Sequence, residues 1–184
     1  MKLLSIATGV AALTLLAGCI PSVYPLYTKE TMVFEPKIIG EWYEEGTDNV
    51  WKFSQVDEFV YELLYTEHGE GSSFEVYAVK LDKFLFMDLF PAELNFKNEL
   101  YKGSFLPMHH FARVDFSGDT LFLHMPDMDY FKKQIAEGKA SVAHEVVNDG
   151  LMLTAKPEEL QKFVLKYAAE DKAFSVESTL SRKK

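Results

Sequence analysis

Short turn signals recur at regular intervals along the first half of this chain, and this rhythm constrains its fold more than any other feature. Turns rich in Gly, Asp, Asn and Glu are expected at residues 46–49, 56–58, 68–71 and 82–83, a spacing of about ten to twelve residues. Two more are expected at 117–119 and 148–150. Between the turns lie runs of aromatic and β-branched residues, which suit pleated strands. The pattern predicts an antiparallel meander.

The expected strands are read from the apolar runs IIGEWYEE, VWKFSQ, FVYELLYT, FEVYAVKL, FLFMDLF, HHFARVDF, TLFLHM, VAHEVV and LMLTA, with AFSVESTL as a closing strand. The run FLFMDLF is apolar on both faces, which predicts a strand covered on each side or one that faces a filled barrel. Asp88 interrupts it. An unpaired buried carboxylate is costly, so Asp88 either faces an edge or is buried with a partner. Residues 92–106 are expected to form a longer loop.

Two helices are expected in the C-terminal half. Asp127 is a suitable N-cap for a helix over 128–137, Asp129 complements the helix dipole, and Gly138 can end it. Pro157 suits the first turn of a second helix. That helix has an apolar stripe made by Leu160, Phe163, Val164 and Tyr167. Asp127 and Asp129 resemble a metal-binding acidic pair, but their roles at the start of the first helix account for both residues.

The N-terminus has the form of a secretory signal. Lys2 is followed by an apolar run from Leu3 to Ile20, and small residues precede Cys19, the single cysteine of the chain. The run also meets the lower length limit of a membrane-spanning helix, about 18 residues, so an uncleaved anchor is the alternative. A lone cysteine excludes an internal disulfide.

The residues Leu16-Ala17-Gly18-Cys19 resemble the lipobox of bacterial lipoproteins. The resemblance implies that the chain is cut before Cys19, that lipid is attached to its thiol, and that its new amine is acylated, for example with palmitate. Two or three acyl chains anchor a protein stably, whereas one chain does so only marginally. In two-membrane bacteria, Ile20 rather than aspartate after the cysteine favours sorting to the outer membrane, facing the periplasm.

This reading divides the chain into three parts: a cleaved signal peptide (1–18), a lipidated cysteine with a tether (19–37), and a single β-rich domain (38–184). The tether is unusually apolar for a flexible linker. We therefore expect it to pack along the domain or to lie at the level of the lipid headgroups.

The opening Gly40-Glu41-Trp42 resembles the Gly-x-Trp motif of lipocalin-type barrels. The resemblance implies that Trp42 plugs the closed end of a barrel beneath an arginine from the last strand. Arg182 is placed for that role, and Arg113 is the other arginine of the chain. The family's second motif, a Thr-Asp-Tyr-like turn, is missing. The expected fold is mainly β: an antiparallel meander closing into a lipocalin-like barrel, with two short helices in the C-terminal half.

Few chemical signatures accompany this fold. The formal net charge of −9 disfavours nucleic acid as a partner, because phosphate contacts supply most of that affinity. The sequence has no Gly-x-Ser-x-Gly elbow, His-Glu-x-x-His helix, phosphate loop or dinucleotide fingerprint. A zinc site would need His124 and His144 to converge with His109 or His110 and a carboxylate. We predict no catalytic residue, metal or cofactor, and the sequence does not indicate ligand-binding residues.

Three functions remain. The first is a lipid-anchored envelope protein whose barrel binds an apolar or amphipathic small molecule, or a protein partner. The second is an accessory subunit of an envelope complex with a filled core, and the third is a hydrolase of envelope components that uses carboxylates or histidines. The 2 Trp, 9 Tyr and 15 Phe residues suit either a core or a cavity. The presence of a cavity separates the first two functions.

Overall fold

The computed structural model describes residues 19–92 and 98–182. Its strands are β1 (Met32–Val33), β2 (Gly40–Glu44), β3 (Val50–Gln55), β4 (Val60–Glu67), β5 (Glu70–Leu81), β6 (Phe84–Pro91), β7 (His110–Ser117), β8 (Thr120–Pro126), β9 (His144–Val147), β10 (Gly150–Leu153) and β11 (Phe174–Arg182). Its helices are the 3-10 turn η1 (Pro36–Ile38), α1 (Glu99–Lys102), α2 (Met128–Ala136) and α3 (Pro157–Tyr167). None of the helices in these ranges is long and apolar enough to cross a membrane.

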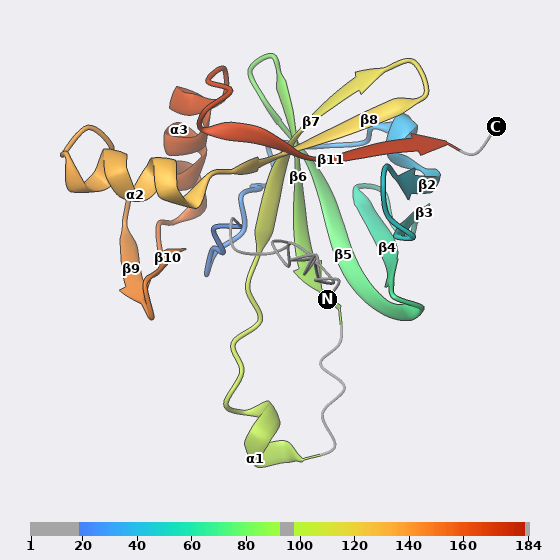
Figure 1. Ribbon diagram of the computed structural model, residues 1–184, viewed down its shortest axis with the longest axis horizontal. Coiled ribbons are helices and arrows are strands. Elements are labelled where there is room, and N and C mark those ends of the chain that lie inside the picture. Colours follow the sequence, from blue (N-terminus) through green and yellow to red (C-terminus); the bar gives the residue numbers. More distant parts are fainter. Residues whose placement is uncertain (1–18, 93–97, 183–184) are drawn as a thin grey trace, which may run out of the picture.

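Eight antiparallel strands, β2 to β8 and β11, close into a barrel (Figure 1). Each strand pairs with both neighbours, and β5 joins β6 through a register that runs from Leu81↔Phe84 to Phe74↔Pro91. The last strand, β11, lies between β2 and β8, so the chain end completes the wall. Closure removes the exposed edges that an open sheet would leave. The predicted mainly β barrel with a closing strand is confirmed.

The two predicted helices are present in the C-terminal half. Asp127 caps α2, since its Oδ1 accepts a hydrogen bond of 2.6 Å from the backbone amide of Tyr130. Gly138, with φ of +68°, follows the end of α2, and Pro157 begins α3. Both helices lie beside the barrel and not inside it (Figure 1).

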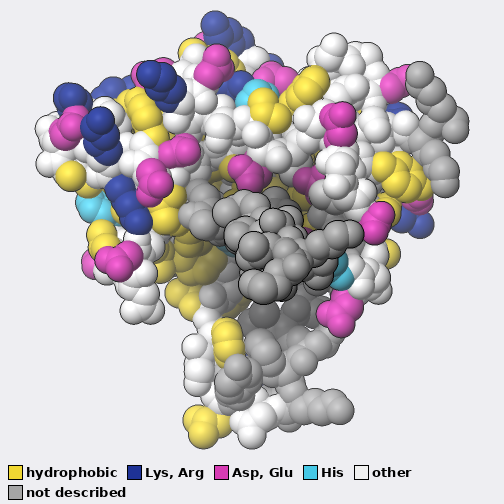
Figure 2. Space-filling view, viewed as in Figure 1, with side chains coloured by type: hydrophobic (Ala, Val, Ile, Leu, Met, Phe, Trp, Pro, Cys, Tyr) yellow, Lys and Arg dark blue, Asp and Glu magenta, His cyan; other side chains and the backbone are white. Residues whose placement is uncertain are grey.

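Two elements differ from the predicted meander. The connection from β6 to β7, expected to be a loop, contains the single turn α1. Helix α1 lies away from the barrel, with hydrophobic side chains beside it (Figures 1 and 2). Strands β9 and β10 form a two-stranded sheet of their own outside the barrel wall, and Leu153 of β10 also forms a bridge with Ser22 of the N-terminal segment. Leu151 and Leu153 of β10 belong to a second core, whereas Val146 and Val147 of β9 are 62% and 53% exposed.

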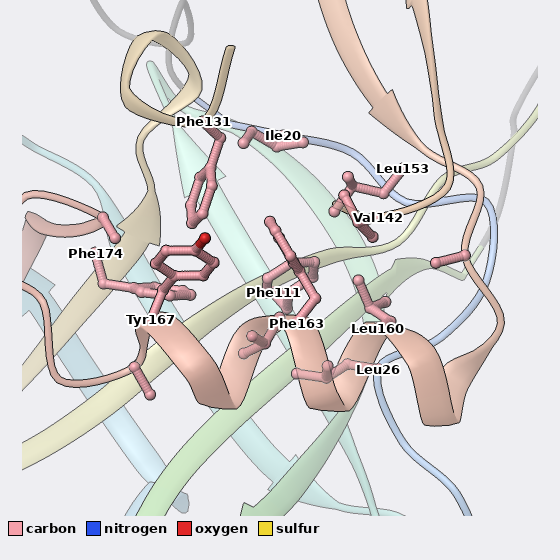
Figure 3. Packing of buried hydrophobic residues seen from close by; sticks show 14 of the residues in the cluster. Ile20, Leu26, Phe111, Phe131, Val142, Leu153, Leu160, Phe163, Tyr167 and Phe174 are labelled. Atoms are coloured by element: carbon pink, nitrogen blue, oxygen red, sulfur yellow. The ribbon is translucent and has the colours of Figure 1, made fainter. Parts of the chain in front are cut away.

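The barrel wall separates two hydrophobic cores. On β6, Met87 and Leu89 point into the barrel, whereas Phe86 packs in the outer core. The outer core fills the space between the barrel, α2, α3 and the β9–β10 hairpin, with Phe111, Phe131, Phe163 and Phe174 near its centre (Figure 3). This accounts for the double-sided apolar pattern of FLFMDLF, which is a strand covered on each side.

The N-terminal segment packs along the domain. Ile20 and Leu26 are 1% and 0% exposed and belong to the outer core (Figure 3). Ser22 pairs with His109 through two backbone hydrogen bonds of 2.9 Å, and the amide of Leu153 donates to the carbonyl of Pro21 at 2.9 Å. The segment therefore behaves as a part of the fold, not as a free linker.

Trp42 and Arg182 close one end of the barrel. The guanidinium carbon of Arg182 lies 4.5 Å from the centre of the Trp42 ring, and Nη2 donates hydrogen bonds of 2.9 Å to the carbonyls of Lys37 and Ile39. Gly40 adopts φ of +132°, and a Cβ there would lie 2.8 Å from Nη1 of Arg182. The arrangement expected from the Gly-x-Trp opening is present, with Arg182 rather than Arg113 over the ring.

Candidate ligand cavity

A cavity of about 250 Å³ occupies the other end of the barrel. Its mouth lies where β2, β4, β6 and β8 end and where β3, β5, β7 and β11 begin. Successive side chains of each strand point to opposite faces of the barrel wall, and the side chains that point inward here are mostly apolar. The apolar lining residues are Trp51, Leu63, Phe74, Leu89, Ala112, Leu123 and Met125. The closed end is filled, since Trp42, Phe53 and Tyr61 are buried there to 2% exposure or less.

Polar side chains gather at the mouth of this cavity. Glu44 is held by neutral donors: Asn49 Nδ2 at 2.9 Å, Trp51 Nε1 at 3.4 Å, and the hydroxyl of Ser178. Glu67 accepts a hydrogen bond of 3.2 Å from the hydroxyl of Tyr65. These contacts orient both carboxylates without neutralising their charge.

Glu177 is a third carboxylate at the mouth, placed by an irregularity of the barrel wall. The register between β11 and β8 shifts between Val176 and Ser178, which leaves Glu177 as a bulged residue. Bulges occur at barrel rims and re-aim a side chain. Here the bulge brings Glu177 into the lining of the cavity.

The electrostatics of the mouth are negative. His110, the first residue of β7, also lines the cavity, and burial lowers its pKa, so the imidazole is neutral at pH 7. Burial, followed by the negative charge of Glu67, raises the pKa of Tyr65, which stays protonated as a donor. The described residues that line the cavity include no Lys or Arg. Such a site suits an apolar group with a hydrogen-bond-donating or positively charged head.

Cys19, predicted as the lipidation site, lies at this mouth and lines the cavity. Burial, and then the charge of Glu177, raises the pKa of its thiol to about 11. The thiolate is the nucleophilic form of cysteine, so an unmodified Cys19 would be inert at neutral pH. The preceding residues of the predicted signal, Leu16, Ala17 and Gly18, lie outside the described residues.

Asp88 is fully buried and has partners, which decides between the two alternatives for this residue. Its Oδ2 accepts a hydrogen bond of 2.7 Å from the amide of Leu26, and its Oδ1 accepts one of 2.7 Å from Nδ1 of His109. The side chain points to the outside of the barrel, beneath the N-terminal segment. Asp88 therefore holds that segment and does not face the cavity.

The four candidate metal-binding histidines do not converge. His109 binds Asp88, His110 faces the cavity, and Nδ1 of His144 lies 2.8 Å from the carbonyl of Val142. No group of His, Cys, Asp and Glu in residues 19–92 and 98–182 could hold a metal ion. The adjacent His109 and His110 face opposite sides of the wall, as their spacing predicts.

His124 belongs to a polar cluster on the outside of β7 and β8. Its Nδ1 accepts from Nη2 of Arg113 at 3.0 Å, and its Nε2 lies 3.0 Å from Asp115. Arg113 also donates to the carbonyl of Ala168 at 2.6 Å, where α3 ends. Burial, and then the Arg113 charge, lowers the pKa of His124. This cluster fastens α3 to the barrel.

The sequence did not indicate the polar residues of the mouth. Glu44 and Glu67 are the last residues of β2 and β4, His110 is the first residue of β7, and Glu177 lies three residues after the start of β11. This placement near strand ends becomes a useful signal only once the strand bounds are known. Comparison with protein-family models, curated proteins and solved structures found no significant match.

Proposed function

We propose that this protein is a lipid-anchored protein of the cell envelope whose barrel binds one apolar or amphipathic small molecule. The observation that carries the proposal is the cavity itself, apolar within and lined at its mouth by three carboxylates. Binding pockets for drug-sized ligands occupy about 300–1,000 Å³, so this cavity suits a small ligand or one tail of an amphiphile. The cavity favours ligand binding over an accessory subunit with a filled core.

The mouth suggests how an amphiphile would be oriented. The tail would replace water against Trp51, Phe74 and Leu89, while the head would stay near Glu67 and Glu177. Burial of the tail supplies affinity in proportion to the apolar area removed from water. The carboxylates add selectivity, since an anionic head would be repelled and a donor or cationic head would be held.

The first experiment is native mass spectrometry on residues 20–184, exported to a bacterial periplasm and purified without detergent. An additional mass that is lost on denaturation would identify the ligand. Ala112→Trp fills the cavity from β7, where Ala112 is 0% exposed. Ala136→Trp, on the exposed end of α2, is the matched control.

A neutral apolar fluorophore, N-phenyl-1-naphthylamine, tests the cavity when no endogenous ligand is retained. We expect the parent chain and Ala136→Trp to bind it, and Ala112→Trp to bind at least about tenfold more weakly, since the new ring occupies the site. Equal binding by all three folded proteins would refute the cavity as the ligand site. The anchor is tested separately, by the mass of the full chain extracted from membranes and its change in Cys19→Ala.

A further inference from the structure

We propose that the open end of the barrel faces the bilayer, so that the cavity opens onto the membrane surface and its ligand enters from there. The inference rests on the membrane attachment proposed above. It adds an orientation for the domain and a route for the ligand.

The first step is the point of attachment. Cys19 lines the cavity mouth, and the chain before it is apolar and uncharged from Leu3 onward. If acyl chains replace that stretch, they begin at Cys19. If the stretch is kept as a membrane span, it also ends there. Both readings place the bilayer at the mouth of the barrel.

The second step is that no flexible linker separates Cys19, the proposed point of attachment, from the folded domain. Ile20, the next residue, is 1% exposed, and Ser22 is already paired with His109 by two backbone hydrogen bonds of 2.9 Å. A flexible linker reaches about 5–6 Å times the square root of its residue number. With no free residue after Cys19, the mouth is held against the headgroups.

The third step is an apolar surface at the same end. Leu100 and Leu106 are 85% and 64% exposed, and they lie in the connection between the end of β6 and the start of β7. Leu89 and His110, in those two strand ends, line the mouth. Helix α1 of this connection lies away from the barrel, with hydrophobic side chains beside it (Figures 1 and 2). Apolar side chains presented together on a projecting loop indicate an interaction surface.

The fourth step is charge, which specifies the kind of bilayer. Glu67 and Glu177 line the mouth, and Asp48 in the β2–β3 turn and Glu70 at the start of β5 are exposed beside it. Anionic headgroups would be repelled from this end, with the effect screened by salt over about 10 Å at 0.1 M. The surface therefore fits a bilayer of zwitterionic lipid.

The test uses the full chain. Cys19 is its single cysteine, so once the Cys19 thiol carries lipid, an introduced cysteine is the one thiol that a label can reach. The variants Leu100→Cys and Leu106→Cys carry a thiol-specific nitrobenzoxadiazole label at the open end. Asp119→Cys is the matched control, because Asp119 is exposed in the β7–β8 turn at the closed end. The proteins are reconstituted into phosphatidylcholine vesicles with or without brominated acyl chains.

We expect bromolipid to quench the labels at 100 and 106 at least twofold and to leave the label at 119 unchanged. Replacing half of the lipid with phosphatidylglycerol should weaken that quenching at low ionic strength. Equal, weak quenching at all three sites, with the intact mass showing membrane attachment, would overturn the orientation alone. Protection of positions 100 and 106 in whole envelopes but not in vesicles would assign the surface to a protein instead. A mass showing neither lipid nor the apolar stretch would overturn the attachment as well.

Discussion

Replacing Asp88 is expected to loosen the N-terminal segment and to weaken the whole domain. The carboxylate is 0% exposed and accepts two hydrogen bonds of 2.7 Å, one from the Leu26 amide and one from His109. Asp88→Ala removes both acceptors at once. The Leu26 amide and the His109 imidazole then lose this acceptor while they stay buried, since Leu26 is 0% and His109 is 8% exposed.

The size of the effect follows from these two contacts. A hydrogen bond to a charged group contributes about 1.5–3 kcal/mol, and removing one partner of a buried pair costs about 3–5 kcal/mol. We therefore expect Asp88→Ala to lower the free energy of unfolding by about 4 kcal/mol. Asp88→Asn keeps one acceptor oxygen and should lose about half as much. For a domain of this size, 1 kcal/mol corresponds to about 2–4 °C in Tm, so Tm should fall by roughly 8–16 °C in the alanine variant.

Urea unfolding of residues 20–184 measures the free energy, and hydrogen exchange measures the Leu26 amide directly. Asp119→Ala, at an exposed turn, is the control and should change stability by less than about 0.5 kcal/mol. The double variant Asp88→Ala/His109→Ala should lose less unfolding free energy than the sum of the two single variants, since both changes remove the same interaction. A loss below about 1 kcal/mol in Asp88→Ala, or unchanged exchange at Leu26, would show that Asp88 does not hold the segment.

Three further predictions concern other parts of the fold. Arg182→Gln should lower the free energy of unfolding by about 2 kcal/mol and shift the tryptophan emission, because Trp42 loses the guanidinium that covers its ring. Urea unfolding followed by tryptophan fluorescence measures both effects, and an unchanged unfolding midpoint would contradict this prediction. The pKa of His124 is lowered by burial and by Arg113, so below about pH 6.5 the unfolded chain binds a proton that the folded chain does not. Unfolding free energy should therefore fall from pH 7.5 to 5.5, and should fall less in His124→Gln; equal slopes would refute this role. In a folded chain without lipid, Cys19, with its pKa of about 11, should react with iodoacetamide at pH 8 about 100-fold more slowly than in urea, as followed by mass.

Local signals were sufficient to predict most of the elements. Asp127 and Gly138 bound α2, and Pro157 begins α3, because caps act through neighbouring backbone groups and need no tertiary context. The turn rhythm predicted the meander for the same reason. The barrel closure was foreseen through Trp42 and a last-strand arginine, and Arg182 fills that role.

Other features depend on which surface covers a residue, and periodicity does not specify that. Leu151 and Leu153 alternate like inward-facing barrel residues, yet they are buried in the outer core against the N-terminal segment. The cavity could not be predicted from the sequence either. Its lining comes from strands that are far apart in the sequence, and its volume is a small difference between the large volumes of the barrel interior and of the side chains packed in it. The bulge at Glu177 has no local signature such as glycine.

The two adjacent histidines show how the N-terminal segment and the cavity are connected. His109 pairs with Ser22 through its backbone and with Asp88 through its side chain, on the outside of the wall. His110, the next residue, points inward and lines the cavity, as Cys19 does. Since successive residues of a strand face opposite sides, a shift of the N-terminal segment moves both at once. The position of Cys19 and the shape of the mouth are therefore set by the same strand, so a displacement of the N-terminal segment would act first on the end of the barrel that holds the cavity.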